Sequence, residues 1–141
     1  MYDMKRHDAL IPLSRDHHQA LILSRLLRND APVYKGLPQD AEGKMKYAKD
    51  YFLQSLSDHF DQEELVFEKV KNIHKDIDQL ITEIVQEHTL LREKFTSLTL
   101  NENITEQLNQ LGRLLETHIR KEERNLFPLI EQHAASKIER K

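Results

Sequence analysis

Two stretches of the sequence, HFDQEELVF at residues 59–67 and HIRKEERNLF at residues 118–127, repeat one pattern of polar and apolar residues. Each begins with a histidine, carries glutamates at the fourth and fifth positions after it, and then returns to apolar residues. Residues four apart lie one above the other on an α-helix, with Cβ atoms about 5–6 Å apart. The pattern therefore predicts two helices, each presenting an imidazole and a carboxylate to one point.

The first pair is His59 with Glu63, and the second is His118 with Glu122. Apolar residues at steps of three and four flank both pairs, so we expect the pairs to face a protein core. A buried carboxylate without a partner is strongly unfavourable, and two are worse. The pattern therefore favours a cation between the carboxylates. Without that cation, we expect a buried carboxylate to take up a proton through a raised pKa.

Hydrophobic periodicity predicts four helices, over residues 14–28, 44–74, 76–98 and from 104 onward. We expect Ser14 to cap the first helix and Pro128 to kink the last one. Four helices with short links favour antiparallel neighbours. The predicted fold class is therefore all-α, an antiparallel up-down four-helix bundle. A length of 141 residues suits a single domain, 1–141, with its core at residues 13–130.

Composition excludes several classes of function. The chain has no cysteine, which rules out disulfides, thiolate catalysis and cysteine-ligated zinc or iron–sulfur clusters. A net charge of −3 gives no reason to expect nucleic acid as a partner. No apolar run approaches the roughly 20 residues that cross a membrane, and the first 13 residues do not read as a secretory signal. We therefore expect a cytoplasmic protein that binds neither nucleic acid nor membrane.

Each of the other two predicted helices also carries a candidate ligand. On the third helix it is His88, which lies on the apolar stripe. On the first helix, His17 and His18 compete for this role. A stripe through His18 would also bring Arg25 and Arg28 to the core, which is unfavourable, whereas the stripe through His17 is more apolar. We predict His17 as the ligand and keep His18 as the alternative.

The motifs LSRDHHQAL (13–21), HFDQEE (59–64), QEHTLL (86–91) and HIRKEERNLFP (118–128) resemble the hemerythrin-like, or HHE cation-binding, family. The resemblance extends over nearly the whole chain. It implies a non-haem site of two iron ions, with Zn or Mn as substitutes. In that family Glu63 and Glu122 would bridge the irons. His59 would bind one iron together with the histidine of the first helix, and His88 and His118 would bind the other.

Two features differ from the oxygen-carrying members of that family. Those proteins have a further histidine one turn from His88, where this chain has Ile84 and Arg92. They also end the site with an aspartate five residues after the last histidine, whereas Glu122 here follows His118 by four. The set of four histidines and two glutamates looks closer to the iron-sensing and iron–sulfur-repair branches. We therefore do not expect reversible oxygen carriage.

The resemblance implies a protein that binds, senses or stores iron or a small ligand such as O2, NO or peroxide. The alternative is a di-iron enzyme, such as a peroxide-reducing or iron–sulfur-cluster-repair protein. No arrangement of nucleophile and base is visible outside the ligand set, which favours binding over turnover. No catalytic residue is therefore assigned. We expect a monomer or a homodimer.

Overall fold

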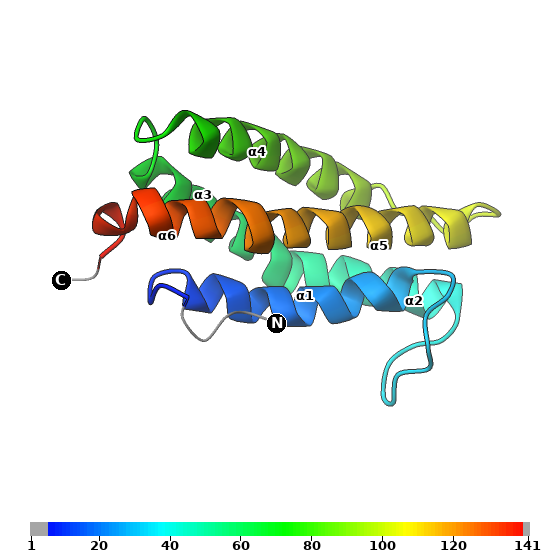
Figure 1. Ribbon diagram of the computed structural model, residues 1–141. Helices are drawn as coiled ribbons and strands as arrows, with labels where there is room; N and C mark the ends of the chain where they lie inside the picture. The colour runs from blue at the N-terminus through cyan, green and yellow to red at the C-terminus, as the bar shows by residue number, and fades with distance from the viewer. Residues whose placement is uncertain (1–5, 140–141) are drawn as a thin grey trace.

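The computed structural model describes residues 6–139, and these residues form an all-helical bundle without strands (Figure 1). The start of the stretch considered as a secretory signal, residues 1–5, and the domain limits at 1 and 141 lie outside the described residues. The elements are α1 (Ile11–Leu27), α2 (Ala41–Tyr51), η1 (Phe52–Leu56), α3 (Ser57–Lys69), α4 (Lys75–Thr96), α5 (Ile104–Lys121), η2 (Glu122–Leu126), α6 (Phe127–His133) and η3 (Ala135–Lys137). No helix in this part of the chain is long and apolar enough to span a membrane.

The elements join into four longer helical segments, which match the predicted four. α1 and α4 each form one segment, whereas α2, η1 and α3 run on without a break, as do α5, η2 and α6 (Figure 1). The connection between α1 and α2 covers residues 28–40, close to the predicted one. It ends at Asp40, whose side chain accepts a hydrogen bond from the Gly43 N–H and caps α2.

The predicted start of the first helix was wrong. α1 begins at Ile11, and Ser14 lies inside it, buried, with its hydroxyl donating to Glu123 Oε2 at 2.7 Å. The residue at the cap position is Leu10, which has no side-chain hydrogen bond to give. Pro12 occupies the first turn, where its missing N–H costs nothing.

The second predicted helix, 44–74, is shorter at its C-terminus than expected. α3 ends at Lys69, and Asn72 has a φ of 64°, a left-handed conformation that asparagine tolerates better than most residues. Ile73, which lies within the predicted helix 44–74, is therefore outside the observed helix and 37% exposed. His74 caps the next helix by accepting from the Asp76 N–H.

Both long composite segments contain a π-helix, η1 in one and η2 in the other. η2 comes directly before Pro128, which lies in the first turn of α6. A proline cannot donate to the carbonyl four residues earlier, and its ring clashes with that carbonyl, so the preceding turn widens. The kink predicted at Pro128 thus corresponds to a π-helical turn in the structure. η1 has no proline to explain it.

The apolar core consists of two clusters. One packs the ends of the helices around Leu23, Phe95 and Leu115, and the other packs the opposite ends around Phe67, Ile84 and Leu126. The buried polar side chains described below belong to neither cluster. The bundle therefore carries a group of buried polar side chains in a mainly apolar interior.

Contacts between α1 and α5–η2 run in reversed sequence order. Ser14 bonds to Glu123, whereas Arg28, near the other end of α1, bonds to Glu116. Gly112 lies against α1, and a Cβ built on it would lie 2.4 Å from the Ser24 carbonyl oxygen. A residue without a side chain is therefore required at this contact between the two helices.

Candidate metal centre

Six of these buried side chains meet in the interior of the bundle. They come from all four helical segments, because α1, α3, α4 and the α5–η2 junction each contribute to the group. Each has at most 4% of its surface exposed. The six are His17, His59, Glu63, His88, His118 and Glu122.

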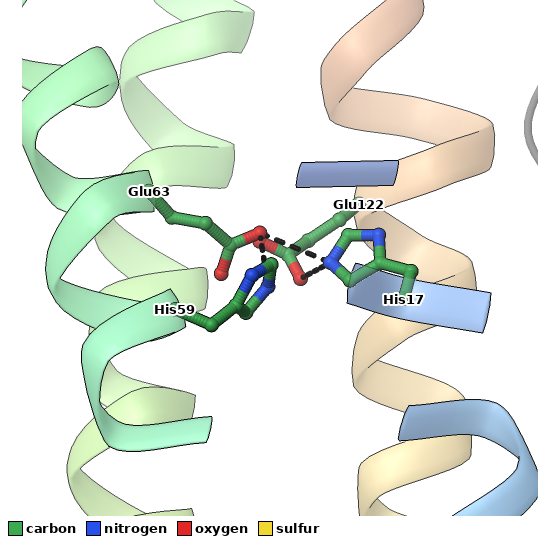
Figure 2. Close-up of side chains that lie close together, drawn as sticks. All are labelled: His17, His59, Glu63 and Glu122. Carbon is green, nitrogen blue, oxygen red and sulfur yellow. Dashed lines mark hydrogen bonds and ion pairs between the residues drawn. The ribbon is translucent and has the colours of Figure 1, made fainter. Parts of the chain in front are cut away.

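One half of the cluster contains His17, His59, Glu63 and Glu122, whose side chains point toward one another in Figure 2. The His17 Nε2 lies 3.1 Å from Glu63 Oε2 and 3.2 Å from Glu122 Oε1. The His59 Nε2 lies 3.3 Å from the same Glu63 oxygen. One donor atom from each of the four residues falls within 4.8 Å of the others, a spacing that suits a single metal ion.

The other half contains His88 and His118 with the same two glutamates. The His88 Nε2 lies 3.0 Å from Glu63 Oε1, and the His118 Nε2 lies 3.1 Å from Glu122 Oε1. Glu63 therefore turns one oxygen toward each half of the cluster. Two groups of four donors share both carboxylates.

A test of whether these residues fit a metal comes from their unpartnered atoms. Among the described residues, the Nε2 atoms of His59 and His118 and both carboxylate oxygens of Glu122 are buried and make no hydrogen bond. The Nε2 atoms lie within 3.1–3.3 Å of a carboxylate oxygen, but the angles do not suit a hydrogen bond. Buried polar atoms without partners are costly. Imidazole nitrogens and carboxylate oxygens are both ligands of first-row transition metals, so the donor set fits bound metal.

The two candidate histidines of the first helix differ in position. His17 is 2% exposed and lies in the cluster, whereas the neighbouring His18 is exposed. The remaining histidines of the chain do not reach the cluster. His74 and His133 stack on each other instead, with ring centroids 4.3 Å apart.

Four further carboxylates contact the cluster histidines, and two of them are the second glutamates of the repeated motif. Glu64 and Glu123, each one step past a core glutamate, contact His88 and His17. Asp16 and Glu87 were missed. The sequence does contain a signal for them, since each directly precedes a histidine of the cluster, in Asp16-His17 and in Glu87-His88.

In the metal-free protein, three of the cluster histidines, His17, His59 and His118, have raised pKa values. Burial lowers the pKa of a histidine, but the Glu63 charge and a bond to Asp16 outweigh burial and raise the pKa of His59 to about 9. Burial also lowers the pKa of His118, but Glu122 raises it to about 10. The surrounding glutamates likewise outweigh burial at His17 and hold its pKa well above the ordinary value.

The expectation that a buried carboxylate would be protonated without metal is wrong for Glu63. Burial would raise its pKa, but the charge on His59 and hydrogen bonds from the neighbouring histidines hold it well below the ordinary value. The reason is proximity. Imidazoles whose Nε2 atoms face the Glu63 carboxylate are close enough, once protonated, to act as its positive partners.

We expect the metal-free protein to lose stability as the pH rises from about 6.5 to 10. Histidines with raised pKa values stabilise the folded state fully below their unfolded pKa of about 6.5. That contribution is lost as the pH passes through the folded values of about 9 for His59 and about 10 for His118. The contribution of Glu63, whose pKa is lowered, is lost only in acid.

Thermal melting of the chelator-treated protein across this pH range measures the trend. A melting temperature that rises between pH 6.5 and about pH 10 would contradict it, because the stabilising imidazolium charges would then be absent.

Comparison with known proteins bears on the second half of the chain. The family model described as the Hemerythrin HHE cation binding domain matches residues 67–140. The chain belongs to this family. The matched part includes His88, His118 and Glu122, so membership makes this a cation-binding domain with candidate ligands in the buried cluster. No curated protein and no solved structure matches the chain.

The family match covers the second copy of the internal repeat, and of the first copy only its last residue, Phe67. The match does not extend to His17, His59 or Glu63, which form the N-terminal half of the repeat. Those three residues are joined to the hemerythrin-like half by geometry, since they share the cluster with His88, His118 and Glu122.

Proposed function

We propose that this hemerythrin-like protein binds two iron ions in the bundle core and uses them to bind, sense or store iron or a small ligand such as O2, NO or peroxide. His17 and His59 would hold one ion, His88 and His118 the other, and Glu63 and Glu122 would bridge them. The observation that carries this proposal is that two four-donor groups share both glutamates. Zn or Mn would bind to the same donors as substitutes.

The proposal includes an antiparallel up-down bundle formed by a single domain with its core at residues 13–130. The reversed order of contacts between α1 and α5–η2 supports it. Contacts of α3 with α4 follow the same trend, since Glu64 meets His88 whereas Ser57, earlier in the chain, meets Arg92. Histidines at similar heights on all four segments would then converge from four directions.

Bound iron would supply open coordination positions and redox chemistry to a small ligand. The chain itself holds the donors and excludes water from one side of the site. Phe60 stacks on His88 with centroids 4.2 Å apart, and its edge faces His118 at 5.8 Å. Phe127 stacks on His17 at 5.6 Å. Phe60 thus covers the His88–His118 half, whereas Phe127 covers His17 in the other half.

A polar cavity lies beside the other half of the cluster. A cavity of about 320 Å³ reaches His59, and polar side chains including Asp16, Tyr51, Ser55 and Asp58 line it. Small polar molecules such as peroxide, and hydrated metal ions, suit such a lining better than apolar molecules do. This cavity supports entry of the ligand at the His17–His59 half.

The positions beside His88 support a role other than oxygen carriage. Ile84, one turn before it, is fully buried in the apolar core, and Arg92, one turn after it, bonds to Ser57 and Asp61 of α3. Neither supplies a ligand to the iron held by His88 and His118. We therefore expect oxidation of the reduced protein in air to be irreversible.

Exposure of the anaerobically loaded ferrous protein to air, followed by removal of oxygen, tests this function. We expect near-ultraviolet absorption of ferric iron to develop and to persist after oxygen is removed. Titration of the ferrous protein with NO and with peroxide should also change the spectrum, with saturation at a fixed ratio to protein. A spectrum that returns fully to the ferrous form would show an oxygen carrier, and a spectrum unchanged by all three ligands would remove the proposed ligand class. Catalytic consumption of peroxide in excess of the iron present would favour the alternative of an enzyme.

A further inference from the structure

Each of the four cluster histidines places its second ring nitrogen, Nδ1, against a carboxylate of another helix. None of these four carboxylates belongs to the pair at the centre. The distances between Nδ1 and the nearest carboxylate oxygen are 2.6 Å for His17 and Glu123, 3.0 Å for His59 and Asp16, 2.7 Å for His88 and Glu64, and 2.7 Å for His118 and Glu87.

The four contacts follow one direction around the bundle. Asp16 on α1 bonds to the histidine of α3, and Glu64 on α3 bonds to the histidine of α4. Glu87 on α4 bonds to the histidine of α5, and Glu123 on η2 bonds to the histidine of α1. Each helical segment thus gives a carboxylate to the histidine of the next, and the series closes. We call Asp16, Glu64, Glu87 and Glu123 the carboxylate ring.

The local sequence explains how one helix can contribute to both the centre and the ring. Successive residues of an α-helix point about 100° apart. In Asp16-His17 and Glu87-His88, the histidine faces the core while the preceding acid faces the neighbouring helix. In Glu63-Glu64 and Glu122-Glu123 the first glutamate faces the core and the second faces a neighbour. The duplicated sequence therefore encodes both layers.

A carboxylate at these distances fixes the proton of the imidazole. An ionised carboxylate can only accept a hydrogen bond, so the Nδ1 of each cluster histidine must donate. In the neutral imidazole the lone pair is then on Nε2, the atom that faces the central glutamates. All four histidines are thereby held in the tautomer and orientation that an Nε2-bound metal requires.

Cations and a hydroxyl hold two members of the ring in place. Glu123 accepts from Arg6 at 3.1 Å and from the Ser14 hydroxyl at 2.7 Å. Glu87 accepts from Lys121 at 2.8 Å. Asp16 has 57% and Glu64 has 38% of its side-chain surface exposed, so water can solvate both.

We propose that the carboxylate ring consists of positioning residues that fix the four histidines for metal binding, each member setting the affinity of one ion. This inference rests on the proposed di-iron function. Asp16 and Glu123 act on the ion of His59 and His17, and Glu64 and Glu87 act on the ion of His88 and His118.

Glu87 allows a matched test, because Glu83 lies one turn earlier on the same helix and binds the same Lys121 at 2.7 Å without contacting a histidine. We expect Glu87→Ala to lower the affinity for one of the two ions by about 10–100-fold. The loss of a carboxylate that bonds to a metal-binding histidine has this effect at other metal sites. Glu83→Ala should leave both affinities unchanged. Glu87→Gln, which keeps a neutral acceptor, should restore part of the affinity.

Competition with a chromophoric chelator, using Co²⁺ as the probe ion, measures both affinities. Proton NMR of the Co²⁺-loaded protein supplies a readout that a purely structural role would not change. The shifted, exchangeable Nδ1–H signals of the bound histidines should number four in the wild type. The His118 signal should exchange rapidly with solvent in Glu87→Ala and remain in Glu83→Ala.

Equal affinities and equal NMR signals in Glu87→Ala and Glu83→Ala would overturn the inference for the ring while leaving the metal site intact. Equal losses in both variants would show that Lys121, rather than the contact with His118, is responsible, and would also overturn it. A wild-type protein that binds no metal would contradict the proposed function. It would also contradict the inference that the carboxylate ring sets metal affinity. Circular dichroism of each variant confirms that the helices are retained.

Discussion

Glu63→Ala and Glu122→Ala should each remove both metal ions from the protein, whereas loss of a single histidine should chiefly affect one ion. The reason is that each carboxylate belongs to both four-donor groups, while each histidine belongs to one. The variants should remain helical, because the two apolar clusters supply most of the packing and include neither glutamate. Metal analysis after loading, together with circular dichroism, measures both effects.

Glu68→Ala is a suitable control for Glu63→Ala. Glu68 lies on the same helix with 67% of its side-chain surface exposed, and it contacts Lys71 rather than the cluster. The Glu68→Ala protein should retain both ions. A Glu63→Ala or Glu122→Ala protein that still holds two ions would contradict the bridging roles.

His17→Ala should lose the ion shared with His59, whereas His18→Ala should retain both ions. His17 places its Nε2 within 3.2 Å of both central glutamates, and the adjacent His18 is exposed. The two variants change neighbouring residues of one helix in the same way, so each is the control of the other. Metal content measures the difference. The reverse result would make His18 the ligand, and retention of both ions in both variants would remove the first helix from the site.

Periodicity and duplication were sufficient to predict the four helical segments and the residues that meet in the core. The reason is that side chains at steps of four share a face, so the position of Glu63 follows from that of His59. The choice between His17 and His18 also followed from periodicity, because the stripe through His17 is the more apolar one.

Features that depend on contacts between helices could not be predicted from the periodicity of a single helix. Ser14 has the side chain of a helix cap, but its hydroxyl bonds to Glu123 from another segment. Asp16 and Glu87 each precede a cluster histidine in the sequence, but the histidine that each one contacts belongs to another helix. Protonation of the metal-free cluster also depends on these distances, which decide whether imidazole or carboxylate holds the proton.

The iron content of the wild-type protein tests the di-iron site most directly. The protein would be loaded with excess Fe²⁺ under anaerobic conditions, desalted, and analysed for iron and zinc against protein concentration. Two donor groups sharing two carboxylates predict about two iron ions per chain. Retention of zinc alone, or of at most one tightly held iron ion per chain, would contradict the di-iron site.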